Sequence, residues 1–290
     1  MHGTFVALDV ETANPDFASI CQVGVVTFTG GQVTGSWQSL VDPEDDFDPV
    51  NVSIHGINAT SVAGAPRFVD VFSDLSRLLT PHVVATHTAF DRVAMSRAQE
   101  KYGLEHLACE WLDTARVCRR AWPQFARRGY GLAPVAKSFG IEFRHHDALE
   151  DARAAGRILV RAMTDTGLGI NDWVVRVRQP LGPLATARSA NPEGELFGEV
   201  IVFTGALSIV RSEAGEIAAR AGCDVRDSVG KTTTILVVGD SDIRKLAGQD
   251  RSAKHRKAES LIMGGQPIRI LAERDFLALV HLDTVEDTHG

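Results

Sequence analysis

The chain has 290 residues, of which 44% are hydrophobic and 23% are charged, and its formal net charge is −7 at pH 7. This composition is typical of globular proteins, and the length suffices for two domains that each have their own core. The negative charge argues against a generally basic nucleic-acid-binding surface, but it leaves room for a local site in which bound metal ions attract phosphate.

The cysteines show neither the C-x-x-C spacing nor the histidine neighbours of a zinc site; they are Cys21, Cys109, Cys118 and Cys223. We therefore expect reduced thiols in a cytoplasmic protein. The chain opens without a cationic and apolar leader, and it contains no apolar run that is long enough to span a bilayer. This pattern predicts a soluble protein with no membrane attachment.

Strand and helix patterns alternate up to about residue 165. Apolar and alternating runs predict three strands near the start, and helical periodicity follows with one more short strand among the helices. We expect strands at Phe5–Val10, Cys21–Thr29, Gln32–Val41 and His82–Ala85, and helices at Arg67–Leu79, Asp91–Lys101, Thr114–Ala121 and Ala148–Thr164. This order predicts an α/β domain with a mixed sheet over residues 1–165.

Residues 166–195 are expected to form a linker, because this segment lacks a regular helical or strand pattern and contains two stretches with Pro and Gly. A second and smaller α/β domain is predicted over residues 196–285. Its strands are expected at Val200–Thr204, Asp224–Arg226, Ile235–Val238 and Ile268–Leu271, and its helices at Ser212–Ala221, Arg256–Met263 and Glu273–Val280.

The most informative feature is a pair of acidic residues, Asp9 and Glu11, at the end of the first predicted strand. Side chains alternate along a strand, so these two point the same way. Carboxylates directed at one place repel each other unless a cation lies between them, and hard divalent ions prefer such oxygen ligands. The alternative is that they are two solvated acids at a strand end.

Two further segments carry acids in suitable places. Asp91 follows the short strand and opens a helix, where an acid can also serve only as a cap. In the segment from His145 to Asp151, Asp147 and Glu150 fit a helix cap and its reciprocal partner. Asp151 is then left to face a site, with His146 in the loop just before the cap.

Together these segments resemble the three motifs of the DEDDh 3′–5′ exonuclease family, which includes the proofreading epsilon subunit of bacterial DNA polymerase III. The first motif matches at Asp9, Glu11 and Thr12, the second at Asp91, and the third at His146 and Asp151. The resemblance covers residues 5 to about 165 and implies a ribonuclease H-like fold. One departure is Thr88, where the family often has Asn.

The resemblance implies that four acids bind two Mg²⁺ or Mn²⁺ ions, which clamp the attacking and leaving oxygens of a phosphodiester. These ligands would be Asp9, Glu11, Asp91 and Asp151. His146 would take a proton from the attacking water, since a histidine with an ordinary pKa near ~6.5 can do so at neutral pH. Substrate contacts are expected from Thr12, His55, Ile57 and Phe90. His145 is expected to be a solvated loop residue outside the site.

The second domain contains Val202-Phe203-Thr204-Gly205, then Gly222, and then a strand that ends in Leu236-Val237-Val238-Gly239. With these motifs it resembles a BRCT domain, similar to that of NAD-dependent DNA ligase, over residues 196–281. Some BRCT domains bind phosphate, and the resemblance implies that Thr204, Gly205, Arg211 and Lys257 would form such a pocket. The alternative is a simple turn beside a solvated basic run. Phe276 occupies a position in the last helix where many BRCT domains have Trp.

We therefore expect a metal-dependent exonuclease that removes nucleoside 5′-monophosphates from DNA 3′ ends. Its BRCT domain would bind DNA, 5′-phosphorylated DNA, a phosphoprotein, a DNA polymerase or a repair protein. Two alternatives remain: an RNA-trimming exonuclease, and a scaffold in which the nuclease domain is vestigial. The intact set of acids argues against a scaffold, because clustered carboxylates cost stability.

Overall fold

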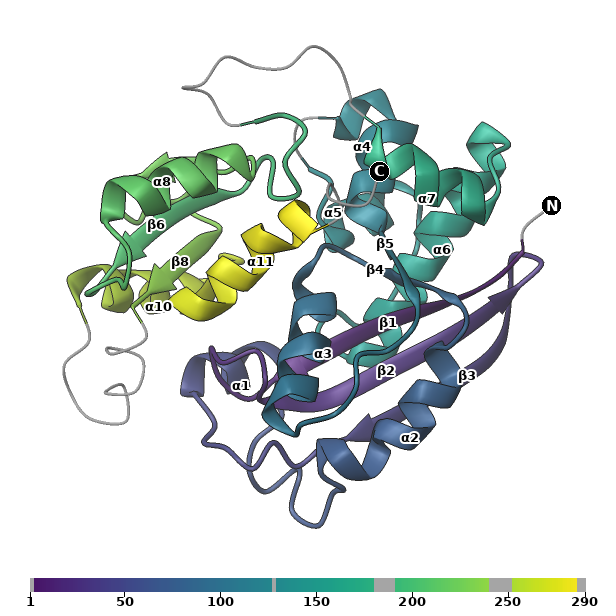
Figure 1. Ribbon diagram of the computed structural model, residues 1–290, viewed down its shortest axis with the longest axis horizontal. Helices are drawn as coiled ribbons and strands as arrows, with labels where there is room; N and C mark the ends of the chain where they lie inside the picture. The colour runs from purple at the N-terminus through teal and green to yellow at the C-terminus, as the bar shows by residue number, and fades with distance from the viewer. Residues whose placement is uncertain (1–2, 127–128, 180–190, 240–251, 286–290) are drawn as a thin grey trace. The chain divides into compact units, whose positions relative to one another are not determined.

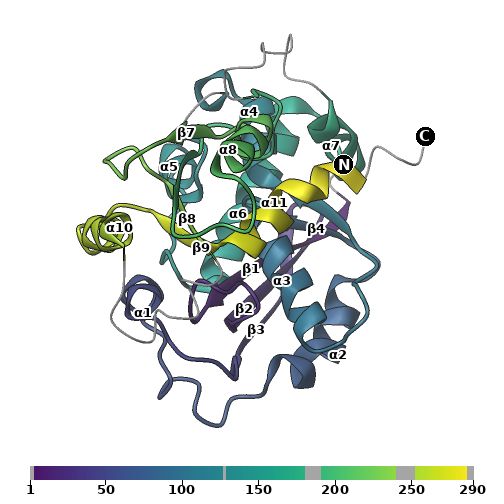
Figure 2. The same cartoon turned by 60° about the vertical axis from the view of Figure 1, so that its left-hand side comes forward.

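The computed structural model describes residues 3–126, 129–179, 191–239 and 252–285. The chain divides into two compact units, Met1–Pro180 and Leu181–Gly290. Each unit contains its own sheet (Figures 1 and 2). In the described part of the chain, no helix combines the length and the apolar character needed to cross a membrane.

The first unit contains a five-stranded mixed sheet with the order β3-β2-β1-β4-β5. β1 (Thr4–Thr12), β2 (Ile20–Thr29) and β3 (Gln32–Leu40) form an antiparallel meander, whereas β4 (Val83–Thr86) and β5 (Glu110–Asp113) run parallel to β1. This arrangement confirms the predicted mixed α/β sheet. β5 was not predicted, because a strand of four residues carries too little periodicity to be recognised.

The helices of the first unit pack against both faces of this sheet. α6 (Ala148–Thr166) covers β1 and β2, and α3 (Phe90–Lys101) contacts β1 in front of it in Figure 1. The other helices are α1 (Pro49–His55), α2 (Phe68–Leu79), α4 (Thr114–Ala121), the 3-10 turn η1 (Pro123–Phe125), α5 (Leu132–Ser138) and α7 (Ile170–Arg178).

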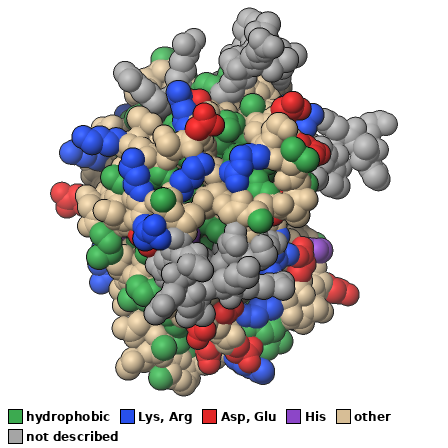
Figure 3. All heavy atoms as spheres, turned by 90° about the vertical axis from the view of Figure 1, so that its left-hand side faces the viewer, with side chains coloured by type: hydrophobic (Ala, Val, Ile, Leu, Met, Phe, Trp, Pro, Cys, Tyr) green, Lys and Arg blue, Asp and Glu red, His purple; other side chains and the backbone are tan. Residues whose placement is uncertain are grey.

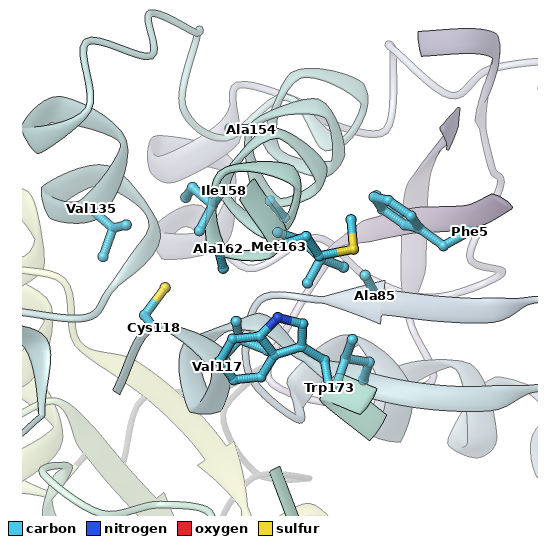
Figure 4. Close-up of a cluster of buried hydrophobic side chains, with 14 of the residues drawn as sticks. Phe5, Ala85, Val117, Cys118, Val135, Ala154, Ile158, Ala162, Met163 and Trp173 are labelled. Atoms are coloured by element: carbon cyan, nitrogen blue, oxygen red, sulfur yellow. The ribbon is translucent and has the colours of Figure 1, made fainter. Parts of the chain in front are cut away.

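The core beneath α6 depends on small residues that let the helix approach the sheet. A Cβ on Gly156 would lie 2.1 Å from the Phe28 ring, and a Cβ on Gly24 would lie 2.3 Å from the backbone of Ala148. Figure 4 shows the resulting cluster, with Phe5 of β1 beside Met163 of α6.

The expectation that residues 166–195 form a linker is wrong for α7. Trp173 is only 1% exposed and packs into the core cluster together with Ile170, Val174 and Val177 (Figure 4). The first unit therefore includes α7 and extends beyond residue 165. Residues 180–190, also assigned to the linker, lie outside the described part of the chain.

The second unit contains a parallel four-stranded sheet with the order β7-β6-β8-β9. Its elements follow the predicted order: β6 (Val200–Thr204), α8 (Arg211–Arg220), β7 (Asp224–Arg226), β8 (Ile235–Val238), α10 (Ala253–Met263), β9 (Arg269–Ala272) and α11 (Glu273–Val285). Phe276 of α11 is fully buried and meets the Phe203 ring edge-on at 5.2 Å. The predicted small α/β domain is confirmed.

The four cysteines are free thiols, and Cys21, Cys118 and Cys223 are buried. Burial raises the pKa of each of these three thiols, so all three remain protonated. Burial also raises the pKa of Cys109 to about 11. Buried neutral thiols are inert packing groups, as their sequence spacing indicated.

Candidate active site

Two carboxylates stand at the C-terminal end of β1, on the face of the sheet that α6 covers. Phe5 and Ala7 of this strand belong to the core under α6, and the alternation of side chains puts Asp9 and Glu11 on the same face. Both acids are partly exposed. The apolar half of β1 therefore fixes the direction in which its acidic end points.

α6 supplies a third carboxylate. Asp147 caps the helix, because its side chain accepts a hydrogen bond from the Glu150 backbone N–H at 3.3 Å. This cap orients the first turn of α6 so that Asp151 is buried. One ligand oxygen from each of Asp9, Glu11 and Asp151 lies within 4.8 Å of the other two.

The Asp151 carboxylate is satisfied on one side only. Its Oδ2 accepts a hydrogen bond from the His146 backbone N–H at 3.2 Å and lies 2.9 Å from His145 Nδ1. Its Oδ1 is buried and has no hydrogen-bond partner among the described residues. A buried carboxylate oxygen without a partner is costly, and a divalent cation among three carboxylates would supply the missing partner. These residues therefore fit a hard divalent ion.

Asp91 is held next to this cluster by a backbone contact. It lies in the first turn of α3, is 6% exposed, and accepts a hydrogen bond through Oδ1 from the Val10 N–H at 3.2 Å. Val10 lies between Asp9 and Glu11, so the contact places Asp91 at the end of β1. It is not one of the three carboxylates that cluster within 4.8 Å.

The two histidines of the third motif lie together. The rings of His145 and His146 stack at 3.9 Å with an interplanar angle of 14°, and each residue contacts Asp151. The expectation that His145 stays outside the site is therefore wrong. The doublet of histidines was visible in the sequence, but the loop conformation that stacks them was not, because it depends on a φ of 66° at His146.

The loop after α1 is tied to the end of β1 by His55. Its Nδ1 accepts a hydrogen bond from the Ile57 N–H at 3.0 Å, and its Nε2 lies 3.1 Å from the carbonyl oxygen of Thr12. Because Nδ1 accepts, the proton is on Nε2, which donates to that carbonyl. Burial lowers the pKa of His55, so the neutral ring is the form that the fold selects.

Two residues expected to contact substrate lie mainly in the core. Ile57 is 8% exposed and packs with Ala13, while Phe90 is 4% exposed and meets Phe17 edge-on. A nucleotide needs an open face to stack on, and these side chains offer little. Direct contact of these two side chains with a substrate stays a prediction; in the structure, Ile57 packs beneath the loop and Phe90 packs at the start of α3.

In the second unit, basic side chains gather at the C-terminal end of β6. Arg211 donates to the carbonyl oxygens of Phe203 at 2.6 Å and Gly205 at 2.8 Å. The Oγ1 of Thr204 lies 2.7 Å from the Oγ of Ser252, the N-cap residue of α10. Of the four residues predicted for a phosphate pocket, the structure brings Thr204, Gly205 and Arg211 together.

The lysine at this place is Lys254, which corrects the prediction of Lys257. Lys254 Nζ donates to the Phe203 carbonyl at 3.0 Å, whereas Lys257 is exposed on the next turn of α10. The helix begins at Ala253, three residues before its predicted start, so Lys254 lies in the first turn. Burial, and next the charge of Arg211, lower the pKa of Lys254.

Solved structures share the fold of the first unit. Exonuclease I, solved with SSB and the inhibitor CFAM, has a TM-score of 0.51 and 16% identity, and the match covers 61% of this chain and 44% of that one. A 3′-exonuclease, solved in the specific recognition of a histone mRNA stem-loop, has a TM-score of 0.50 and 18% identity, covering 57% and 83%. The first unit thus has the ribonuclease H-like exonuclease fold.

Sequence comparison gives the family. The model described as Exonuclease matches residues 6–159, and the BRCA1 C Terminus (BRCT) domain model matches residues 194–262. The chain therefore belongs to the exonuclease family and carries a C-terminal BRCT domain.

Its curated relatives include large polymerases. The PolC-type DNA polymerase III of Bacillus cereus is 26% identical over 166 residues, which are 56% of this chain and 11% of that protein. The enzyme of the same name from Streptococcus thermophilus is 28% identical over 160 residues, which are 54% and 11% of the two chains. The match therefore spans about a tenth of the length of these relatives.

Proposed function

We propose that the protein removes nucleoside 5′-monophosphates from DNA 3′ ends, with two Mg²⁺ or Mn²⁺ ions held by Asp9, Glu11, Asp91 and Asp151. The observation that carries this proposal is the cluster of three carboxylates, in which the buried Asp151 Oδ1 has no hydrogen-bond partner among the residues that the structure describes. Divalent ions supply charge for the phosphate oxygens and make bound water a stronger nucleophile.

The chain's own groups have separate tasks in this reaction. His146, beside Asp151, accepts the proton of the attacking water. Thr12, whose backbone is fixed by His55 and Asn51, lines the end of β1 where the terminal nucleotide enters. Asp91, anchored on the Val10 N–H, keeps its carboxylate at the end of β1.

DNA is preferred to RNA in this proposal because the polymerase relatives are DNA polymerases by name. These relatives and the free thiols also favour a cytoplasmic protein in bacterial replication or repair. An RNA-trimming activity is the second candidate, since one protein of the same fold was solved with a histone mRNA stem-loop.

A degradation assay with end-labelled oligonucleotides tests the activity and its substrate. Matched single-stranded and duplex DNA and RNA are incubated with the full chain and Mg²⁺ or Mn²⁺, and with the Asp9→Ala variant as control. We expect 5′-monophosphates from DNA 3′ ends with the wild-type chain only. Faster loss of the RNA would make the protein an exoribonuclease, and loss of neither would leave the scaffold alternative.

For the BRCT domain, we propose a phosphate pocket formed by Thr204, Gly205, Arg211 and Lys254. The cationic side chains of Arg211 and Lys254 both donate to the carbonyl oxygen of Phe203. An anion bound between them would reduce the repulsion between the two positive charges. Figure 3 shows Lys and Arg side chains gathered in a row on one face of the molecule, although the net charge is negative. A 5′-phosphorylated DNA end, or a phosphorylated polymerase or repair protein, would recruit the exonuclease through this pocket.

Binding by the full chain carrying Asp9→Ala, which does not degrade its ligand, tests the pocket. We expect a preference for 5′-phosphorylated over 5′-hydroxyl DNA or for a phosphopeptide over its unmodified form. Lys254→Ala should lower that preference about tenfold or more, the value of a charge-assisted hydrogen bond of about 1.5–3 kcal/mol. Lys257→Ala removes the same charge three residues away and should leave the preference unchanged. Equal effects of the two substitutions would mean a diffuse basic surface.

A further inference from the structure

His145 contacts two members of the proposed active site at once. Its Nδ1 lies 2.9 Å from Asp151 Oδ2, and its ring stacks on that of His146 with centroids 3.9 Å apart. The side chain is 42% exposed, so part of the ring is open to solvent. The centroid of the Phe143 ring lies 5.5 Å from that of His145. His145 is thus a partly exposed side chain whose polar atom and ring face are both directed at the site.

The contact with Asp151 determines which carboxylate oxygen remains for a metal ion. Oδ2 receives two donors, the His145 Nδ1–H and the His146 backbone N–H. Only Oδ1 is then left, and it is buried without a hydrogen-bond partner in the described part of the chain. Hydrogen bonds of this kind fix the rotation of ligating carboxylates and typically change metal affinity by 10–100-fold.

The contact with His146 acts on a backbone that needs support. His146 has a φ of 66°, in the left-handed region that costs a residue with a side chain about 1–2 kcal/mol. Such a conformation persists only where neighbouring contacts hold it. The parallel stack with His145 restricts the rotation of the His146 ring, and a general base must keep its orientation to be effective.

We propose that His145 is a positioning residue: its Nδ1–H directs Asp151 Oδ1 toward the metal ions, and its ring holds His146 in its orientation as the base. This inference rests on the proposed function of the site. Both neutral and protonated histidine can donate from Nδ1, so the role does not depend on the charge of His145.

Three substitutions of His145 separate the two contacts. His145→Asn keeps an N–H donor near the Nδ1 position and removes the ring. His145→Phe keeps the ring and removes the donor, and His145→Ala removes both. His106→Ala, on an exposed loop of the same unit, is the control for loss of an imidazole.

Two measurements on the full chain read out the two contacts. Mn²⁺ binding without substrate, followed by electron paramagnetic resonance, reports on Asp151; kcat on a DNA oligonucleotide at saturating Mn²⁺ reports on His146. We expect Mn²⁺ affinity to fall about 10–100-fold in His145→Ala and His145→Phe but to stay near wild type in His145→Asn. We expect kcat at saturating metal to fall in His145→Ala and His145→Asn and to be largely kept in His145→Phe.

Two results would overturn the inference. One is wild-type Mn²⁺ affinity and kcat in His145→Ala, which would make the residue a bystander. The other is an equal loss of both quantities in all three variants together with a lower melting temperature than His106→Ala, which would show a general structural role. Failure of the proposed function is distinguishable, because the wild-type chain itself would then bind no Mn²⁺ and degrade no 3′ end.

Discussion

Gly24 on β2 stands directly opposite Asp9 on β1, and the start of α6 packs onto Gly24. A Cβ at this position would lie 2.3 Å from the backbone carbon of Ala148 and the backbone nitrogen of Leu149. Backbone atoms at the start of a capped helix cannot move aside as a flexible side chain can. The missing side chain therefore sets the distance between β1 and the helix that carries Asp151.

We expect Gly24→Ala to impair both stability and activity. Overpacking of this kind costs about 1–3 kcal/mol, and the displaced helix would separate Asp151 from Asp9 and Glu11. Gly35→Ala on β3 is a matched control, because its Cβ would meet only Thr27 at 3.7 Å, an ordinary contact. Gly24→Ala should lower both the free energy of unfolding in urea and kcat by more than Gly35→Ala does. If the two variants lost equal amounts, α6 would have adjusted to the added methyl group without disturbing the site.

The inclusion of α7 in the first unit gives a second prediction. Trp173→Ala should lower the free energy of unfolding by about 3–5 kcal/mol, because it leaves a large cavity in the core. Trp173→Phe should lower the free energy of unfolding much less. The buried Nε1–H of Trp173 makes no hydrogen bond within the described residues, so its removal eliminates the desolvation penalty of an unpaired donor. Equal and small effects in thermal unfolding would contradict the packing of α7.

The part of the fold that was predictable from the sequence consists of long or strongly patterned segments. The buried run of β1 and the long amphipathic α6 give clear periodicities, so both were placed within a few residues. α7 was missed although Ile170, Trp173, Val174 and Val177 follow the i, i+3, i+4, i+7 spacing of an amphipathic helix, because the helix has only nine residues and a Pro- and Gly-containing stretch follows it. Local patterns do not say what a short helix packs against.

The same limit applies to the candidate site. Asp9 and Glu11 were predictable because strand alternation is a local property. His145 was not, because its contact with Asp151 depends on the left-handed backbone of His146. Lys254 was missed through a different error: Ser252 is a good N-cap residue, and taking it as the helix start would have placed Lys254 in the first turn.

Thr88, where related exonucleases often have Asn, gives a third prediction. Its φ is 86°, a region that β-branched residues rarely adopt and that Asn tolerates, and its buried Oγ1 has no hydrogen-bond partner within the described residues. We expect Thr88→Asn to raise the free energy of unfolding by about 1 kcal/mol. Thr88→Ser, which keeps the hydroxyl group but removes the β-branch, should raise the free energy of unfolding by less. A loss of stability in Thr88→Asn would mean that the loop needs the threonine methyl group for packing.

The last prediction concerns pH and His55. Burial lowers the pKa of His55 in the folded state, whereas the unfolded chain takes up a proton near pH ~6.5. Below that pH the unfolded state binds more protons than the folded state, so the free energy of unfolding falls as the pH falls toward the folded pKa. The contribution of the neutral ring is therefore complete above about pH 6.5 and is lost progressively in more acidic solution. Protonation of Nδ1 would also break its hydrogen bond from Ile57.

His55→Asn isolates this effect from the other histidines of the chain. The Asn Oδ1 can still accept from the Ile57 N–H, but the hydrogen bond to the Thr12 carbonyl is lost, so stability at pH 7.5 should fall by about 0.5–1.5 kcal/mol. Because the variant no longer titrates at this position, the difference in unfolding free energy from wild type should narrow between pH 7.5 and pH 5.5. A gap for His55→Asn that stays constant would mean that folding does not lower the pKa of His55, and a gap that widens in acid would mean that protonated His55 stabilises the loop.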